Sequence, residues 1–94
     1  MNCNVSLQIV PLVAEEKIYP LVDQVITLIK DSGVKYLVGP METTMEGELD
    51  QLLKLVGEAH QLCISQGAGR IISVVKIDQK IGGVTIEEKI KKHR

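Results

Sequence analysis

The sequence predicts an α+β fold whose elements follow the order strand, helix, strand, strand, helix, strand, with a short helix or tail after them. Three observations support this prediction: the first residues alternate between apolar and polar, two later stretches repeat apolar residues at helical spacing, and Gly and Pro separate these stretches. Two strand-helix-strand units with right-handed crossovers form a four-stranded antiparallel sheet with both helices on one face. This is the ferredoxin-like plait, with the first and third strands central and the second and fourth at the edges.

The first unit spans residues 3–38. Its first strand starts at Cys3 and loses regular pairing at Pro11; its apolar positions are Val5, Leu7 and Ile9, and its polar positions are Asn4, Ser6 and Gln8. We expect residues 13–19 to form a loop and Pro20 to stand in the first helical turn, where its missing N–H costs nothing. Ser32-Gly33 ends that helix, and Val34 to Val38 form the second strand.

The second unit begins at the Gly39-Pro40 turn, which reverses the chain into a third strand from about Glu42 to Gly47. A second helix starts at Glu48, and its predicted apolar stripe holds Leu49, Leu52, Leu53, Val56, His60, Cys63 and Ile64. Gly67-Ala68-Gly69 ends it. The fourth strand, Arg70 to Lys80, contains adjacent apolar residues that suggest burial on both faces for part of its length.

Residues 81–94 form a basic tail of a single domain that spans residues 1–94. The Gly82-Gly83 pair separates this tail from the fourth strand, and the basic segment after the two glycines is compatible with a short final helix. One interpretation is a solvated, frayed terminus. The other is an arm that packs on a neighbouring subunit through Ile86 and Ile90.

Composition excludes several classes of protein. Eleven basic and twelve acidic residues give a net charge of -1, and aromatic residues make up 2%, so we expect no nucleic-acid partner. Cys3 and Cys63 are far apart and form no redox or zinc motif, two histidines are too few for a site with several His ligands, and we expect no cofactor. No apolar run approaches the ~20 residues of a membrane span and no signal segment is present, so we expect a cytoplasmic, soluble protein without a membrane partner.

Polar residues gather on the sheet face that the predicted helices leave uncovered. Ser6 and Gln8 on the first strand are expected beside Thr44 and Glu46 on the third. Glu46 is the strongest single candidate for a site, because an acid beside Gly47 on a central strand has no evident packing role. An uncovered face beside an apolar fourth strand favours oligomerisation. The charges on the fourth strand, which are Lys76, Asp78 and Lys80, either limit edge pairing or form ion pairs between subunits.

The residues give no reason to expect catalysis. No nucleophile elbow or phosphate-binding glycine loop is present, and the loop after the first strand carries Glu15 and Glu16, which would repel phosphate. His60 on the apolar stripe of the second helix fits a core or interface histidine better than a catalytic one.

Five segments, in this order along the chain, resemble the thiamine-binding, YkoF-like family of small proteins. The most specific of them is Gly39-Pro40-Met41 followed by Thr43 or Thr44 and then Glu46-Gly47. The other four are Val10-Pro11-Leu12, residues 32–36, residues 67–70 and residues 76–78. The resemblance implies a ferredoxin-like fold, homo-oligomers built from dimers, and binding of thiamine or its hydroxymethyl-pyrimidine portion without turnover. The sequence departs from the family at Val13 to Ile18, where a short run of Gly, Ser and Thr is common.

The implied ligand can be matched to the residues. An aminopyrimidine is flat, so it needs acids or hydroxyls along one edge and apolar groups against its two faces. We expect Glu46, Thr43, Thr44 and Ser6 at the edge and Met41, Met45 and Tyr36 at the faces. Glu46 would accept a hydrogen bond from the amino group, or donate one to a ring nitrogen.

Two other functions remain open. One is a structural or regulatory oligomer, either a homo-dimer or a tetramer, in which the polar stripe is a hydrogen-bond network between subunits and no small molecule binds. The other is an enzyme whose site is completed across subunits by His60 or Arg70.

Overall fold

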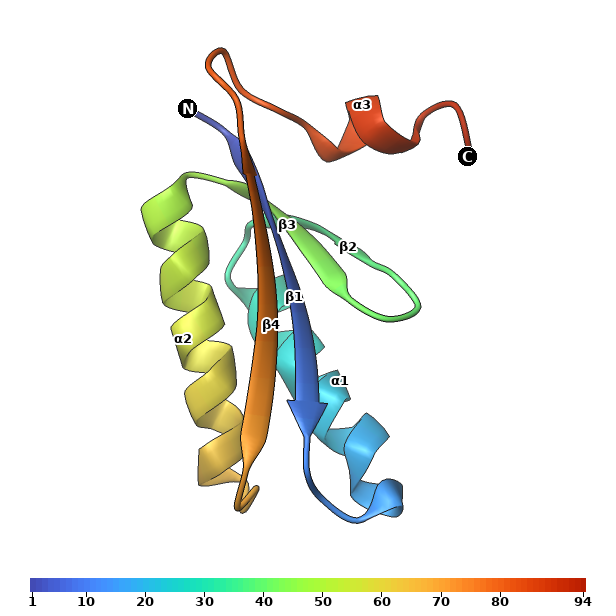
Figure 1. Ribbon diagram of the computed structural model, residues 1–94, viewed down its shortest axis with the longest axis vertical. Coiled ribbons are helices and arrows are strands. Elements are labelled where there is room, and N and C mark those ends of the chain that lie inside the picture. The colour runs from blue at the N-terminus through green and yellow to red at the C-terminus, as the bar shows by residue number, and fades with distance from the viewer.

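The computed structural model describes residues 1–94 and contains the predicted elements in the predicted order (Figure 1). The strands are β1 (Cys3–Pro11), β2 (Lys35–Val38), β3 (Thr43–Gly47) and β4 (Ile71–Gln79). The helices are α1 (Glu15–Asp31), α2 (Leu49–Ser65) and the short α3 (Ile86–Ile90). Both long helices lie on one side of the sheet, and α3 lies at the end of the molecule that also holds the N-terminus.

The four strands are antiparallel in the order β2-β3-β1-β4, which confirms the plait and its two central strands. β4 pairs with β1 along its whole length, from Gln79 opposite Cys3 to Ile71 opposite Pro11. The pairing of β3 with β1 ends earlier, at Thr43 opposite Leu7. Residues 8–11 of β1 therefore have a strand on one side only, and their other backbone edge is free.

The core lies between the sheet and the two long helices. Val5 and Leu7 are buried there, as the alternation predicts, together with Met45 of β3. Cys3 and Cys63 are also buried in this cluster, and neither forms a disulfide. Burial raises the pKa of both thiols above the ordinary value of 9.0, so both remain protonated at neutral pH and serve as packing groups.

Helix α1 begins at Glu15, so the prediction of a loop over residues 13–19 with Pro20 in the first turn is wrong. Pro20 is the sixth residue of the helix. Because a proline there removes one internal hydrogen bond close to the helix start, the preceding turn can still form, and Glu15 and Glu16 interact favourably with the positive end of the helix dipole. The other end is as predicted: the helix stops before Gly33, whose φ of 83° suits glycine.

The buried stripe of α2 differs from the predicted one. Leu52, Leu55, Ala59 and Cys63 are buried, whereas Leu53 and Ile64 are exposed. His60 is half-buried beside this stripe, and its Nδ1 lies 2.7 Å from Ser73 Oγ of β4. This hydrogen bond ties the helix to the edge strand and gives His60 a structural role.

Strand β4 is more exposed than predicted. Ile72 and Val74, which were expected to be buried on both faces of the sheet, are each 44% exposed. The register places them beside Val10 and Gln8 of β1 on the face opposite the helices. No element covers that part of the face, so an apolar patch stays open to solvent.

The C-terminal segment folds back onto its own chain. Gly82 and Gly83, with φ of 94° and 96°, turn the chain back, and Val84 N–H donates to Asn2 O over 3.2 Å. Val84 and Ile86 are then buried within the chain itself. Ile86 is thus an internal anchor that holds α3 against the sheet.

Candidate functional site

The predicted polar stripe exists on the helix-free face, which we call the open face. Ser6 pairs with Thr44 and Asn4 with Glu46 in the register of β1 and β3. Ser6 Oγ and Thr44 Oγ1 are hydrogen-bonded at 2.6 Å. The open face therefore brings together three of the six predicted site residues, which are Ser6, Thr44 and Glu46.

Glu46 has a structural partner that the sequence did not reveal. Its Oε1 accepts a hydrogen bond of 2.6 Å from Ile86 N–H at the start of α3. Thr85 caps the same turn by accepting from Glu88 N–H. One carboxylate oxygen of Glu46 is thus used to fix the C-terminal helix.

Charged side chains on the open face pair within the chain. Lys76 Nζ lies 2.7 Å from Glu42 Oε1, and Lys89 Nζ lies 2.6 Å from Asp78 Oδ2 and 2.8 Å from Asn4 Oδ1. Lys76 and Asp78 of β4 therefore have partners in their own subunit.

The remaining three predicted site residues do not lie on the open face. Tyr36 is opposite Met45, Thr43 is opposite Leu7, and both face the helix layer because their partners are core residues. Met45 itself is fully buried, so it has no surface to offer a ligand ring. Met41 lies in the turn between β2 and β3 and is 75% exposed.

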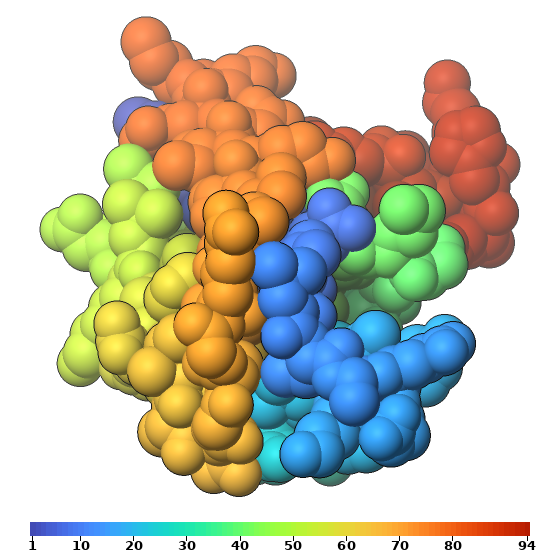
Figure 2. All heavy atoms as spheres, turned by 60° about the horizontal axis from the view of Figure 1, so that its bottom comes forward, coloured from blue at the N-terminus to red at the C-terminus, as the bar shows by residue number.

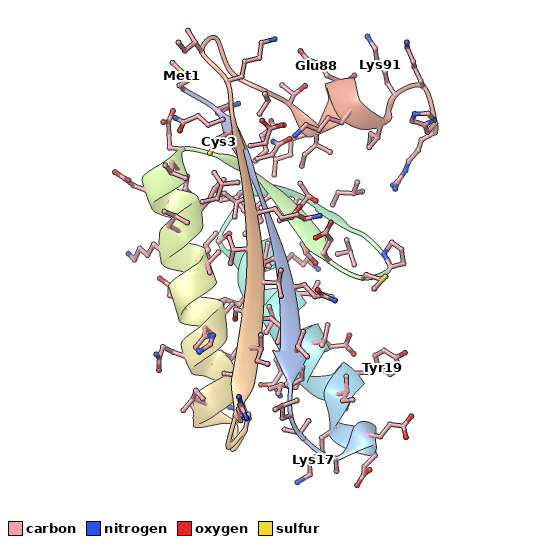
Figure 3. The ribbon with its side chains drawn as sticks, viewed as in Figure 1. Met1, Cys3, Lys17, Tyr19, Glu88 and Lys91 are labelled. Carbon is pink, nitrogen blue, oxygen red and sulfur yellow. The ribbon has the colours of Figure 1, made fainter.

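Met41 and Thr43 instead share a cavity of about 270 Å³ between α1, β1 and the β2–β3 turn. We call it the motif pocket; it is lined by Leu7, Gln8, Ile9, Tyr19, Val22, Val25, Ile26, Ile29, and residues 38–43. Tyr19 projects from the first half of α1 on the same side of the molecule as the β2–β3 turn (Figure 3). In the space-filling view, the blue segment that leads into α1 and the green β2–β3 turn likewise lie on one side of the molecule (Figure 2). Tyr19, Gln8 and Glu42 were not predicted as site residues.

The motif pocket combines apolar walls with few polar groups. Thr43 is nine-tenths buried, and none of the side-chain hydrogen bonds in the chain uses its hydroxyl. Gln8 and Glu42 also line the pocket, but the register places the Gln8 side chain on the open face, and the Glu42 carboxylate is paired with Lys76. The free edge of β1 also begins at Gln8, where pairing with β3 has ended. The pocket can therefore offer donors and acceptors along one side of a flat, mostly apolar molecule.

A larger cavity of about 420 Å³ lies at the N-terminal end of α1 and is lined in part by Val13, Glu16, Lys17 and Gly67. The segment from Val13 to Ile18, where the sequence departs from the family pattern, contributes to this cavity and not to the motif pocket. None of the residues of this departure lines the motif pocket.

No group of three or more His, Cys, Asp or Glu side chains is placed to hold a metal ion. None of the helices is long and apolar enough to cross a membrane.

The fold and its pockets define a small α+β domain of the ferredoxin-like class that carries a compact, largely apolar pocket beside a central strand. The chain belongs to the thiamine-binding protein family, whose pattern matches residues 5–94. The family resemblance predicted from the sequence is therefore confirmed.

Individual relatives agree with this membership. A UPF0045 protein of Clostridium perfringens is 58% identical over 93 residues, which cover 99% of this chain and 98% of the relative. The structure of a domain of unknown function from Bacillus cereus is 43% identical, with a TM-score of 0.91 over 100% of this chain and 91% of that one. A proposed thiamine biosynthesis or salvage protein from Thermotoga maritima is 38% identical, with a TM-score of 0.92 over 100% of both chains.

Proposed function

We propose that this protein binds thiamine, or a related aminopyrimidine such as hydroxymethyl-pyrimidine, in the motif pocket and does not convert it. One observation carries the proposal: the hydroxyl of Thr43, a residue that is 7% exposed, has no hydrogen-bond partner from the chain and lies in a mainly apolar pocket. Because this hydroxyl is not closed off by the chain, a ligand atom in the pocket can form a hydrogen bond with it.

The pocket suits a small flat ring. Its volume of about 270 Å³ is near the lower limit of ~300 Å³ that is usual for pockets of drug-sized ligands. Met41 and Tyr19 are exposed, largely apolar side chains that line the pocket, and they would pack against the two ring faces. The Thr43 hydroxyl and the free backbone edge of β1 would meet the amino group and the ring nitrogens.

This assignment keeps Thr43 and Met41 from the residues predicted as ligand contacts and gives the others different roles. Tyr36 packs on the core behind the pocket, Ser6 and Thr44 bind each other on the opposite face, and Glu46 fixes α3.

The proposal is supported by family membership and by the suggested thiamine role of the Thermotoga relative. Binding without turnover is supported by the placement of the histidine that was considered for catalysis. His60 is hydrogen-bonded to Ser73 between α2 and β4, away from the residues that line the motif pocket.

Calorimetric titration with hydroxymethyl-pyrimidine tests the motif pocket by comparing variants of Thr43 and Thr44, which are adjacent in β3 but face opposite sides of the sheet. Thr43→Val keeps the side-chain shape but removes the hydroxyl, so we expect about five- to tenfold weaker binding, the usual contribution of one hydrogen bond. Thr44→Val makes the same change on the open face and should leave the affinity unchanged. Weaker binding in Thr44→Val alone would place the ligand on the open face and refute the motif pocket.

We also propose that the protein forms homo-oligomers. The support is the uncovered apolar patch around Ile72 and Val74, a kind of surface that commonly marks an interface. The same patch favours the second candidate function, a structural or regulatory oligomer without a ligand. A thermal-shift measurement separates the two, because a ligand at 100 times its dissociation constant stabilises by ~2.7 kcal/mol.

A further inference from the structure

A second cavity, of about 240 Å³, lies on the open face on the other side of the sheet. We call it the open-face pocket; it is lined by Asn4, Ser6, Thr44, Lys76, Ile77, Asp78 and Lys89. Ile77 is its only apolar residue, so it lacks the walls that a flat ring requires. The motif pocket and the open-face pocket therefore suit different chemistry.

The open-face pocket contains a donor that no group of the chain satisfies. Asn4 is 3% exposed, its Oδ1 accepts from Lys89, and its Nδ2 is buried without a hydrogen-bond partner. Unpartnered buried donors are rare because they lose their bonds to water and gain none. An acceptor from outside the chain would remove this cost.

The neighbouring groups add further donors. Ser6 and Thr44 use one hydroxyl proton for the bond between them, which leaves the other proton for a further acceptor. The ammonium groups of Lys76 and Lys89 each have three protons. Lys76 uses one of them for Glu42, and Lys89 donates to Asp78 and Asn4. Asp78 is the one carboxylate in the lining.

Donors thus outnumber acceptors, and two of the side chains that supply them are cationic. We propose that the open-face pocket binds a small phosphoryl oxyanion, held by Asn4 Nδ2, the Ser6–Thr44 hydroxyl pair and the ammonium groups of Lys76 and Lys89. A phosphoryl group only accepts hydrogen bonds, and bonds from charged donors are the strongest of their kind. Because Asn4 Nδ2 is closed to solvent, binding requires the half-exposed Lys89 side chain to leave Asn4 Oδ1 and turn to the anion.

The anion has two possible sources with the same chemistry. It is either free phosphate or the phosphate of an esterified ligand whose ring occupies the motif pocket. The second source rests on the proposed function, and the ion pair between Glu42 and Lys76 supports it. Glu42 lines the motif pocket and Lys76 lines the open-face pocket, so this pair connects the two.

Titration of the protein with inorganic phosphate at low ionic strength, followed by calorimetry and ³¹P NMR, tests the proposal. Lys76→Gln removes a charged donor and should weaken binding about ten- to hundredfold. Asp78→Asn removes the carboxylate that repels the anion and competes for Lys89, so it should tighten binding. Lys54→Gln makes the same charge change on the exposed side of α2 and should have little effect.

A second titration, with hydroxymethyl-pyrimidine and its phosphate ester, distinguishes the sources. If the phosphate ester is the ligand, it binds more tightly than hydroxymethyl-pyrimidine itself, and Lys76→Gln removes this difference in affinity. If phosphate binds alone, its affinity is unaffected by the alcohol. The proposal is overturned if neither inorganic phosphate nor the ester shows binding that depends on Lys76, or if Lys54→Gln and Lys76→Gln have equal effects. Phosphate binding without pyrimidine binding would refute the proposed function and leave this inference intact.

Discussion

At the scale of single residues, Glu46 shows why a conspicuous side chain is not always a ligand contact. On the sequence it is an acid on a central strand without a packing role. In the structure it accepts a hydrogen bond from Ile86 N–H, 40 residues further along the chain. No local pattern predicts such a partner, because it depends on how the C-terminal segment folds back over the sheet.

Glu46→Ala should weaken the attachment of α3 to the sheet without changing the affinity for hydroxymethyl-pyrimidine. Loss of a hydrogen bond to a charged acceptor costs about 1.5–3 kcal/mol, and the amide of Ile86 would lose its protection. We expect faster hydrogen exchange at Ile86 and a lower free energy of unfolding in urea. Glu46→Gln keeps an oxygen acceptor and should show a smaller change. Weaker hydroxymethyl-pyrimidine binding with unchanged exchange would instead make Glu46 a ligand contact.

Thr43 and Thr44 show what the sequence can decide about the site. Adjacent residues of a strand point to opposite faces, so the two threonines cannot both contact one small ligand on one face. Alternation predicted correctly that Thr44 and Glu46 share a face with Ser6. It could not predict that Tyr19 of α1 lines the same pocket as Met41, because that arrangement depends on where the helix begins and how it crosses the sheet.

At the scale of elements, the order of strands and helices was predictable because alternation, helical spacing and turn residues all agree. The residues at which the elements begin and end were less predictable. Pro20 was placed at the start of α1, but the helix begins at Glu15, since one missing hydrogen bond near a helix end is tolerated. The buried stripe of α2 was shifted because its apolar residues form a broad face of the helix, and tertiary packing selects which of them become buried.

The turn between β2 and β3 requires a glycine at its first position. Gly39 N–H donates to Glu42 O over 2.8 Å, and a Cβ atom at Gly39 would lie 2.9 Å from that same oxygen. The backbone of Glu42 would have to move, and with it the neighbouring Met41 and Thr43.

Gly39→Ala should therefore lower the free energy of unfolding by about 1–3 kcal/mol, the usual cost of overpacking. It should also weaken hydroxymethyl-pyrimidine binding, because the turn forms one wall of the motif pocket. Gly57→Ala is the matched control: no atom lies within 4 Å of the added Cβ, and alanine in mid-helix should stabilise by ~0.5–1 kcal/mol. Denaturation in urea and calorimetric titration measure both effects. If Gly39→Ala leaves the affinity for hydroxymethyl-pyrimidine unchanged, the turn between β2 and β3 is not part of the ligand site.

At the scale of the whole molecule, the two faces of the sheet have different coverings. The long helices bury one face, whereas on the other α3 and its ion pairs cover only the end near Asn4 and Glu46. Sequence reasoning predicted the helix layer, because its apolar stripes are periodic. It did not predict the partial cover, because α3 is held by a few hydrogen bonds and by Val84 and Ile86 and has no long apolar stripe.

The uncovered half of the open face should be the contact between subunits. Ile72 and Val74 are each 44% exposed there, and association would remove both from water. We expect the wild-type protein to be a dimer or tetramer in sedimentation equilibrium, and Ile72→Lys to shift it toward monomer, because a buried lysine without a partner opposes association. Ile64 of α2 is an equivalent control, since it is also isoleucine and 43% exposed but lies on the helix side. Ile64→Lys should leave the assembly intact. A monomeric wild-type protein, or dissociation by Ile64→Lys alone, would show that the open face is not the interface.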